Sequence, residues 1–321
     1  MNHLESNHIL DDYQYGFRPS HSCQAQLISI VEELQLALDC HQLVDLIMLD
    51  FSKAFDTVPH QHLLKKLLFY GIDDKLHHWL STWLTKRSQR VVVDGCESEY
   101  VSVLSGVPQG TVLGPVMFLL YINDINNNVS SSLRLFADDC IIYRAINSEQ
   151  DHLQLQQDLH TVNEWSQQWQ MCFNVSKCVV LRCYRILSPS LFTYILNEQS
   201  ISCIDQHSYL GVTLTSNMSF SPHIQKISAK ATRMLNFIRR NLYNCSKEIK
   251  SRAYLTLVRP ILEYASPVWD PHLVKDRDQI EKVQRAAAHW VSSDYCWSSS
   301  VSSMLNLLNW PTLFLRRKIS K

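Results

Sequence analysis

The stretch Leu133–Tyr143 reads LRLFADDCIIY and places two adjacent aspartates, Asp138 and Asp139, between two apolar runs. Runs of this length and composition are typical of the two strands of a hairpin, with the aspartates at its turn. Neighbouring carboxylates repel each other, and near an apolar core they cost free energy unless a positive charge neutralises them. Three interpretations remain open: a solvated turn, a salt-bridged pair, or a site for a divalent metal ion.

A third carboxylate stands at the end of another apolar run. LVDLIMLDF (43–51) has the composition of a buried strand, and Asp50 lies near its end. If this strand and the aspartate hairpin are neighbours in one sheet, three carboxylates converge on one patch. Such a patch can hold two Mg²⁺ ions, since Mg²⁺ prefers oxygen ligands. Two metal ions about 3.5–4 Å apart can activate a hydroxyl and stabilise a leaving oxygen.

The remaining elements alternate helices with strands up to about residue 215. The patterns predict helices after Pro59 with a stop at Gly71, at 75–84, at 116–125 and at 148–170. They predict a hairpin across Asp94–Gly95 and strands near 178–184 and 208–214. From about residue 220 only helices are expected, at 223–243, 247–265 and 275–292. This order predicts an α+β domain on a split βαβ plan, followed by a helical region.

The formal net charge of zero conceals an uneven distribution. Residues 1–60 carry nine acids against two bases, and residues 221–260 carry nine bases against one acid. The acidic N-terminal segment favours a metal site, and the basic segment at 221–260 favours a polyanionic partner. The alternative is an uneven spread of ordinary solvated charge.

The cysteines and the lengths of the apolar runs indicate in which cellular compartment the protein is expected. The ten cysteines include no CxxC pair, and the His and Cys neighbours lack the spacing of a zinc site, which favours reduced thiols in an intracellular protein. The first residues, MNHLESNHILDD, lack the features of a secretory signal, and no apolar run reaches membrane-spanning length. We therefore expect a nuclear or cytoplasmic protein that is neither secreted nor membrane-bound.

Five blocks of the sequence resemble, in the same order, the reverse transcriptases of non-LTR (LINE-type, jockey-like) retrotransposons. They are YQYGFRPSHSCQAQL (13–27), LDFSKAFDTVPHQHLLKKL (49–67), SGVPQGTVLGPVMFLLYINDI (105–125), LRLFADDCIIY (133–143) and SYLGVTL (208–214). The resemblance implies a right-hand polymerase fold with partial fingers at 1–42 and a ferredoxin-like palm at 43–215. Inserted helices and a hairpin at 60–104 belong to that palm, and a helical thumb with the start of a C-terminal region covers 216–321.

The resemblance also implies an activity and its metal ligands. An enzyme of this family is an RNA-directed DNA polymerase that extends a primer 3′-hydroxyl with dNTPs, using two Mg²⁺ ions or Mn²⁺ as a substitute. Asp50 corresponds to the first metal-binding aspartate, with the carbonyl oxygen of Phe51 as a further ligand. Asp138 corresponds to the second, and Asp139 is its partner. RNA template, DNA primer and dNTPs are the implied partners, with no membrane and no obligatory protein partner.

Further residues match the blocks that surround nucleotide and template. Phe55 falls where the family places an aromatic ring under the incoming sugar, which would exclude a 2′-hydroxyl by its bulk. The alternative is a core phenylalanine at a helix start. Gly106, Pro108, Gln109 and Gly110 match the block that lies against the template and the nascent base pair, where glycine permits close backbone approach.

Of three further cations, Arg18 and Lys177 have two interpretations each. Arg18 suits a triphosphate or template phosphate, or else a salt bridge to Asp11 or Asp12. Lys177 matches a lysine near the leaving pyrophosphate, where it would donate a proton, or else is an exposed lysine. Lys53, together with Asp56, is expected to fix the turn after Asp50.

The helix expected at 223–243 carries an apolar stripe and a separate cationic stripe. The apolar residues are Ile224, Ile227, Ala231, Leu235, Ile238 and Leu242, and the cations are Lys226, Lys230, Arg233 and Arg240. Such a helix can dock on a domain while it follows a phosphate backbone, or its cationic face is simply solvated. Its position after a polymerase-like palm favours a nucleic-acid-binding thumb.

Two other functions remain as alternatives. Relatives usually begin with an endonuclease domain and continue past this chain's last residues, so the sequence resembles a fragment of a retrotransposon reading frame with truncated fingers. A catalytically inactive relic that only binds nucleic acid is therefore the first alternative. The second is an unrelated metal-dependent phosphohydrolase, which would not need the GVPQG loop or the basic helix.

Overall fold

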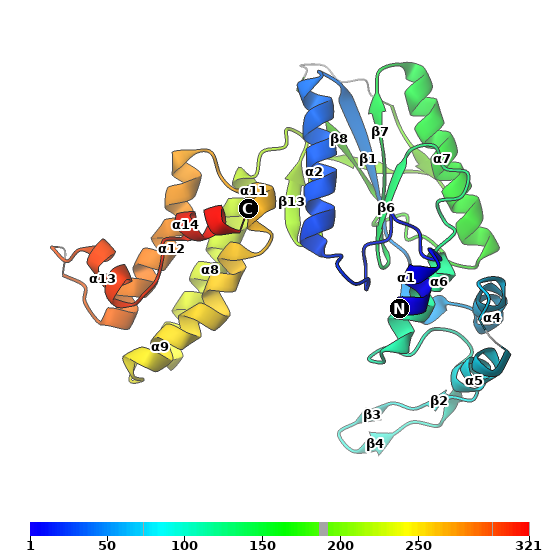
Figure 1. The fold of residues 1–321 in the computed structure, drawn as a ribbon, viewed down its shortest axis with the longest axis horizontal. Coiled ribbons are helices and arrows are strands. Elements are labelled where there is room, and N and C mark those ends of the chain that lie inside the picture. The colour runs from blue at the N-terminus through cyan, green and yellow to red at the C-terminus, as the bar shows by residue number, and fades with distance from the viewer. Residues whose placement is uncertain (73, 186–191, 297, 321) are drawn as a thin grey trace. The chain divides into compact units, whose positions relative to one another are not determined.

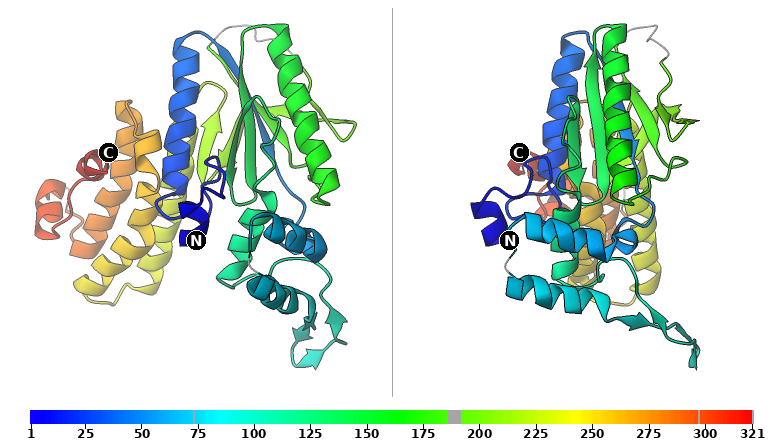
Figure 2. Two further views of the ribbon diagram at one scale, coloured as in Figure 1. Left: turned by 45° about the vertical axis from the view of Figure 1, so that its right-hand side comes forward. Right: turned by 90° about the vertical axis from the view of Figure 1, so that its right-hand side faces the viewer.

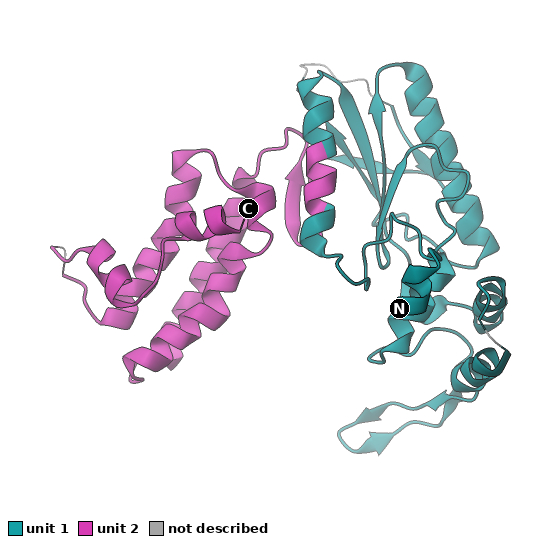
Figure 3. Cartoon of the chain, viewed as in Figure 1, with its two compact units in different colours: residues 1–26, 33–205 teal, residues 27–32, 206–321 magenta. Residues whose placement is uncertain are grey.

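The chain forms two units in the structure, which is a computed structural model describing residues 1–72, 74–185, 192–296 and 298–320 (Figure 1). The first unit comprises residues 1–26 and 33–205, and the second comprises residues 27–32 and 206–321 (Figure 3). Helix α2 (Cys23–Asp39) contributes residues to both.

The first unit is built around a five-stranded sheet with the order β11–β8–β1–β7–β6. Its strands are β1 (Leu43–Leu49), β6 (Ser132–Phe136), β7 (Asp139–Ile146), β8 (Val179–Cys183) and β11 (Ser202–Ile204). β1 lies antiparallel to both β7 and β8, β6 and β7 form a hairpin, and β11 is parallel to β8. The chain thus runs from β1 through helices to the β6–β7 hairpin, then through a helix to β8. The predicted mixture of sheet and helix is confirmed.

The helices that the sequence predicts after Pro59 and near 75–84, 116–125 and 148–170 are present, whereas the first three helices of the unit were not predicted. The helices of the first unit are α1 (Asn2–Ser6), α2, α3 (Ala54–Thr57), α4 (His60–Phe69), α5 (Asp74–Thr85), α6 (Leu113–Ile122) and α7 (Glu149–Gln168). α4 starts after Pro59 and stops where Gly71 takes a φ of 73° that favours glycine. α7 begins at Ser148, whose N–H donates to Asp151 Oδ2 at 3.0 Å in a capping box. Figures 1 and 2 show α7 running lengthwise beside the strands.

Short strands form the predicted hairpin after α5. They are β2 (Ser88–Gln89), β3 (Val92–Val93), β4 (Cys96–Glu97) and β5 (Val101–Ser102), with β2 paired to β5 and β3 paired to β4. Elsewhere in the unit, β9 (Ile195–Leu196) and β10 (Gln199–Ser200) form a separate short pair. Asp94 and Gly95 have φ values of 50° and 81°, as a type I′ hairpin turn requires. Figure 2 shows this ribbon projecting from the rest of the unit.

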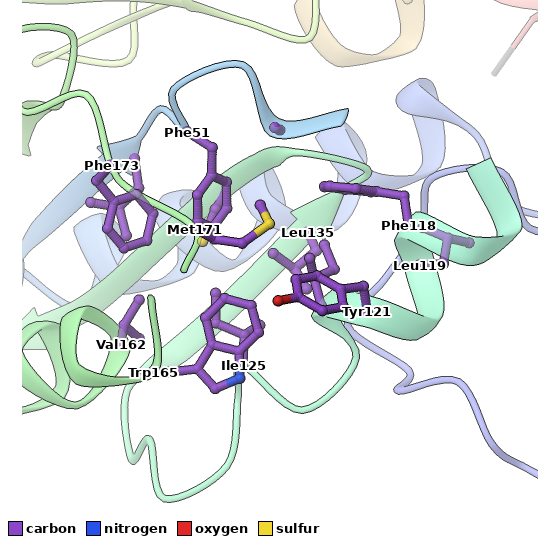
Figure 4. Close-up of a cluster of buried hydrophobic side chains, with 14 of the residues drawn as sticks. Phe51, Phe118, Leu119, Tyr121, Ile125, Leu135, Val162, Trp165, Met171 and Phe173 are labelled. Atoms are coloured by element: carbon purple, nitrogen blue, oxygen red, sulfur yellow. The ribbon is translucent and has the colours of Figure 1, made fainter. Parts of the chain in front are cut away.

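The hydrophobic core of the first unit lies against the sheet. All seven residues of β1 are buried, and α6 is buried on most of its circumference, in keeping with its apolar sequence. Phe51, two residues after the end of β1, stacks on Phe173 with ring centroids 4.3 Å apart (Figure 4). Met171 and Trp165 belong to the same cluster. The segment that follows β1 is therefore anchored in the core.

A buried ionic network crosses the middle of the sheet. Asp45 on β1 is fully buried, and its cross-strand partner on β8 is Arg182. Arg182 Nε and Nη2 donate to Asp45 Oδ1 and Oδ2 at 2.7 and 3.2 Å. The hydroxyl of Tyr194 donates to Asp45 Oδ2 at 2.8 Å, and His152 Nδ1 lies 3.3 Å from the same oxygen. Each charge thus depends on its partner, because neither reaches water.

The second unit combines one hairpin with helices. Its elements are β12 (Gln206–Tyr209), β13 (Val212–Thr215), α8 (Ser221–Asn241), α9 (Lys247–Ala253), a π-helical turn (Tyr254–Val258), α10 (Arg259–Glu263), α11 (Ser266–Trp269), α12 (Val274–Ser292), α13 (Val301–Leu307) and α14 (Leu313–Ile319). In the described part of the chain, no helix is both long and apolar enough to cross a membrane.

Two predictions for this unit need correction. The single strand predicted at 208–214 is wrong: β12 and β13 form a hairpin, because Leu210 and Gly211 turn the chain with φ values of 43° and 82°. The helix predicted at 247–265 is interrupted by the π-helical turn at Tyr254–Val258, just before Pro260, which has no N–H to donate. The helix predicted at 275–292 is confirmed as α12.

Acid is expected to destabilise the second unit through His223, which lies in α8 and is 1% exposed. Burial, with the charge of Lys226, lowers the pKa of His223 to about 4. Between pH 6.5 and 4 the unfolded chain binds a proton that the folded chain does not, so stability falls by up to about 3 kcal/mol as pH falls. Urea unfolding at pH 7 and pH 4.5 measures this loss.

His223→Asn is the matched variant for this prediction, because its amide oxygen can accept the hydrogen bond that Thr213 N–H donates to Nδ1. The variant should lose less stability between the two pH values than the parent chain. An equal loss in both would contradict the assignment to His223.

Candidate active site

Asp50 leaves the end of β1 at the centre of the sheet. Its N–H donates to Cys178 Sγ at 3.5 Å, and its carbonyl oxygen accepts from Asn174 N–H at 2.7 Å, so its backbone is held from the β8 side. Its Oδ2 atom is buried and accepts no hydrogen bond. The cation that reaches it is Lys177, whose Nζ lies 3.5 Å away.

The aspartate turn lies directly beside Asp50. Phe136 and Asp139 form the last pair of the β6–β7 hairpin, and Asp138 stands in the turn between them. Leu49 on β1 pairs with Cys140 on β7, which brings Asp50 across from Asp139. The expectation that the two elements are sheet neighbours is thus confirmed.

The two aspartates of the turn have raised pKa values. Partial desolvation, with the negative charges of Asp138 and Asp50, raises the pKa of Asp139 to about 6. Desolvation also raises the pKa of Asp138, and the charge of Asp50 adds to the effect. The aspartate turn therefore favours a nearby positive charge, because a cation there would make the carboxyl groups of Asp138 and Asp139 easier to ionise.

The donor set fits a hard divalent cation, although the carboxylates are not drawn together into a cage. Within the described ranges, no group of three or more His, Cys, Asp or Glu side chains is arranged to hold a metal ion as it stands. The unpartnered Oδ2 of Asp50 and the crowded carboxylates of Asp138 and Asp139 nevertheless leave oxygen ligands free for Mg²⁺.

Two phenylalanines follow Asp50 and have different surroundings. Phe51 is buried against Phe173, so its side chain is structural. Phe55 is half-buried in α3, with its ring stacked on Phe118 at a centroid distance of 4.3 Å and edge-on to Phe17. Stacking on Phe118 thus holds the ring of Phe55 in place, and the side chain remains partly exposed to solvent.

The GVPQG loop packs against the turn that follows Asp50. Gly106 has a φ of 86°, and a Cβ there would lie 2.8 Å from the carbonyl oxygen of Asp56, so the chain's own backbone requires glycine. Gly110 has a φ of 76° with open space around it. Gln109 Nε2 donates to Asp56 Oδ1 at 2.8 Å, next to the half-buried Pro108. The sequence did not reveal that Asp56 orients Gln109.

An open pocket of ≈ 680 Å³ lies beside this loop. It is lined by Lys53, Asp56, Arg87, Gln89 and residues 102–109. Lys53 has a left-handed φ of 49° and its carbonyl oxygen accepts from Asp56 N–H, which agrees with the predicted role of this pair in the turn. Arg87 was not recognised from the sequence, and its Nη2 donates to the Gly106 carbonyl oxygen at 3.2 Å.

Arg18 is engaged inside the first unit. Its side chain is 6% exposed, and its Nε and Nη2 donate to Glu5 Oε1 and Oε2 at 3.0 and 2.7 Å. Its Nη1 donates to the carbonyl oxygens of Asp11 and Gln14. The salt-bridge alternative therefore holds, with Glu5 as the acid in place of Asp11 or Asp12, and the guanidinium is not free for a phosphate.

Lys177 and the basic helix keep exposed charges. Lys177 is largely exposed beside Asp50, where an ion pair adds little stability. On α8 the predicted apolar stripe is buried except for Leu242, which follows the helix and is partly exposed. The cations Lys226, Lys230, Arg233 and Arg240 are all exposed on that helix.

Comparison with known proteins points to one family. The model of the family described as Reverse transcriptase (RNA-dependent DNA polymerase) matches residues 1–214. The chain is 28% identical over 312 residues to a Drosophila melanogaster protein named "Probable RNA-directed DNA polymerase from transposon X-element", covering 90% of this chain and 33% of that protein. It is 29% identical over 273 residues to the RNA-directed DNA polymerase from mobile element jockey of the same species, covering 80% of this chain and 29% of that protein.

Solved structures agree with the fold. The structure of apo telomerase from Candida tropicalis superposes with a TM-score of 0.52 at 11% identity, covering 95% of this chain and 49% of that one. The chain spans about a third of the length of the curated relatives it matches. These matches confirm the resemblance drawn from the five sequence blocks.

Proposed function

Since the chain belongs to the reverse transcriptase (RNA-dependent DNA polymerase) family, we propose that it extends a primer 3′-hydroxyl with dNTPs on an RNA template. The observation that carries the proposal is the meeting of Asp50 with Asp138 and Asp139 at neighbouring strand ends. The antiparallel order β8–β1–β7–β6 supports a ferredoxin-like palm at 43–215. Residues 1–42 would then be the fingers and residues 216–321 the thumb.

Asp50, Asp138, Asp139 and the carbonyl oxygen of Phe51 would hold two Mg²⁺ ions. When bound, these ions would lower the pKa of the primer hydroxyl and neutralise charge on the phosphates. The chain's own part is positioning and charge complementarity, with little covalent chemistry. Lys177, next to Asp50, would donate a proton to the leaving pyrophosphate.

The surrounding residues would position nucleotide and nucleic acid. Gln109, oriented by Asp56, would contact the nascent base pair, with Pro108, Gly106 and Gly110 shaping the loop beneath it. The exposed cations of α8 would follow the phosphate backbone, and their contribution would fall as salt rises. Arg18 would act indirectly, by tying the N-terminal segment to Glu5.

Phe55 would discriminate against ribonucleotides. Its ring is fixed on Phe118, so a 2′-hydroxyl above it would meet an immovable surface. Phe55→Val is expected to lower the preference for dTTP over UTP by about 10–200-fold, the range that pocket shape alone supplies. Single-nucleotide incorporation kinetics measure the ratio of kcat/KM for the two substrates.

Phe55→Tyr keeps the ring and serves as the matched variant, so it should keep most of the preference. If Phe55→Val folds and still excludes UTP as the parent does, the steric role of this ring is refuted.

A catalytically inactive relic that only binds nucleic acid is the competing function, and the exposed cations of α8 would serve it equally well. Extension of a DNA primer on a defined RNA template with one dNTP withheld distinguishes the two. A polymerase stops at the position that needs the missing nucleotide. A relic binds the duplex and leaves the primer unchanged, and a template-independent phosphohydrolase shortens or dephosphorylates the substrate.

A further inference from the structure

The N-terminal segment pairs with the edge of the sheet beside the aspartate turn. Tyr15 N–H donates to the Leu135 carbonyl oxygen at 2.9 Å, and Leu135 N–H donates to the Tyr13 carbonyl oxygen at 2.9 Å. Gln14 lies between these two residues and is 1% exposed. A buried amide next to the candidate site therefore has a function that the sequence blocks do not reveal.

The Gln14 side chain is bonded to both backbone groups of Ala137. Its Oε1 accepts from Ala137 N–H at 2.9 Å and from Gly16 N–H at 2.7 Å, and its Nε2 donates to the Ala137 carbonyl oxygen at 3.4 Å. A Cβ on Gly16 would lie 2.3 Å from the Ala137 nitrogen, so the segment lies directly against the turn. The backbone of the segment thus bonds to Leu135, and the Gln14 side chain bonds to Ala137.

Ala137 needs such support because of its conformation. Its φ is 54°, whereas Asp138 is not among the positive-φ residues, which is the sign pattern of a type II′ turn. Glycine is favoured at this first turn position, and a residue with a Cβ costs on the order of 1–3 kcal/mol there. A strained conformation persists only when its surroundings enforce it.

We propose that Gln14 is a positioning residue for the aspartate turn. Its amide holds Ala137 at positive φ and thereby fixes the direction in which Asp138 and Asp139 leave the hairpin. The kinetic part of this inference rests on the proposed polymerase function, and the structural part does not. Outer residues that orient metal ligands typically change metal affinity or activity about 10–100-fold when they are removed.

Gln14→Leu in the full chain tests the proposal with three readouts. In ¹⁵N-alanine-labelled protein, the Ala137 amide should exchange with solvent about 2–10-fold faster, because a hydrogen bond contributes about 0.5–1.5 kcal/mol net. The dissociation constant for Mn²⁺, read from free Mn²⁺ by EPR, should rise about 10–100-fold. In primer extension, kcat should fall by a similar factor, while KM for the primer–template stays unchanged.

Two further variants separate positioning from general destabilisation. Gln284→Leu removes a buried glutamine of the second unit that donates to the Pro311 carbonyl oxygen, and it should leave Ala137 exchange unchanged. Ala137→Gly, added to Gln14→Leu, should restore Mn²⁺ affinity in part, because glycine adopts positive φ without strain.

The proposal is overturned if the Ala137 amide of Gln14→Leu exchanges as slowly as in the parent chain. It is also overturned if that amide loses protection while Mn²⁺ affinity and kcat both remain at parental values. If the parent chain incorporates no dNTP, the polymerase function fails, and amide exchange with Mn²⁺ binding still decides the role of Gln14.

Discussion

Replacing Asp138 and Asp139 together by asparagine is expected to lower RNA-templated dNTP incorporation at least about 10³-fold, since one preorganised electrostatic group alone is worth about 10²–10³. An asparagine oxygen carries no charge, so it cannot neutralise a divalent cation as a carboxylate does. The position of these two residues beside Asp50 at paired strand ends is the basis for the expectation. Single-turnover primer extension with Mg²⁺ measures the change.

Stability and a matched aspartate separate this loss from unfolding. Burial, together with the charges of Asp138 and Asp50, raises the pKa of Asp139 to about 6, so replacing both carboxylates by neutral amides should leave the folded chain at least as stable at pH 7. Asp94→Asn is the matched control, because it changes an aspartate in another hairpin turn. Asparagine before Gly95 suits a type I′ turn, so this variant should keep the activity of the parent chain. A folded double variant with activity within about tenfold of the parent would remove the aspartate turn from the mechanism, because an electrostatic group of this kind is worth more.

Arg182→Met is expected to lower the unfolding free energy of the first unit by about 3–5 kcal/mol, because it leaves a buried charge without its partner. Asp45 is fully buried and relies on Arg182 for two hydrogen bonds. The remaining partners do not supply a fixed positive charge, because Tyr194 is neutral and burial disfavours the protonated form of His152. Hydrogen exchange of β1 amides under native conditions reports this free energy for the first unit alone.

The double variant Asp45→Leu/Arg182→Met is the control for this prediction. Replacing both charges by apolar groups of similar size should recover most of the lost stability, since desolvation of the pair offsets much of its attraction. If Arg182→Met alone lowers the unfolding free energy by less than about 1 kcal/mol, water must reach Asp45. A double variant as unstable as the single one would show that packing, not charge, dominates at this position.

Local patterns were sufficient for the elements that carry the candidate site. The apolar run at 43–51 contains the buried strand β1, and Asp94–Gly95 forms the turn its residue types demand. The prediction for 208–214 was wrong because the alternation of polar and apolar residues there also suits one continuous strand. No local pattern shows that Leu210 adopts a positive φ beside Gly211. Tertiary packing of Tyr264 over Gly211, with its hydroxyl donating to the Leu210 carbonyl oxygen, supports that turn.

Contacts between distant segments could not be predicted from one sequence. Arg18 forms its salt bridge with Glu5 and not with Asp11 or Asp12, which are closer in sequence, because the N-terminal segment folds back on itself. Asp45 and Arg182 are partners only because β1 and β8 are aligned by a register set elsewhere in the sheet. Gln14 reaches Ala137 for the same kind of reason. Such pairs follow from topology, which local propensity does not encode.

Incorporation of labelled dTTP on poly(rA)/oligo(dT) with Mg²⁺ by the purified chain tests the central claim most directly. We predict template-dependent incorporation by the parent chain and its loss in Asp138→Asn/Asp139→Asn. Folded protein that binds the duplex without incorporating dTTP would contradict the polymerase function and favour the inactive relic.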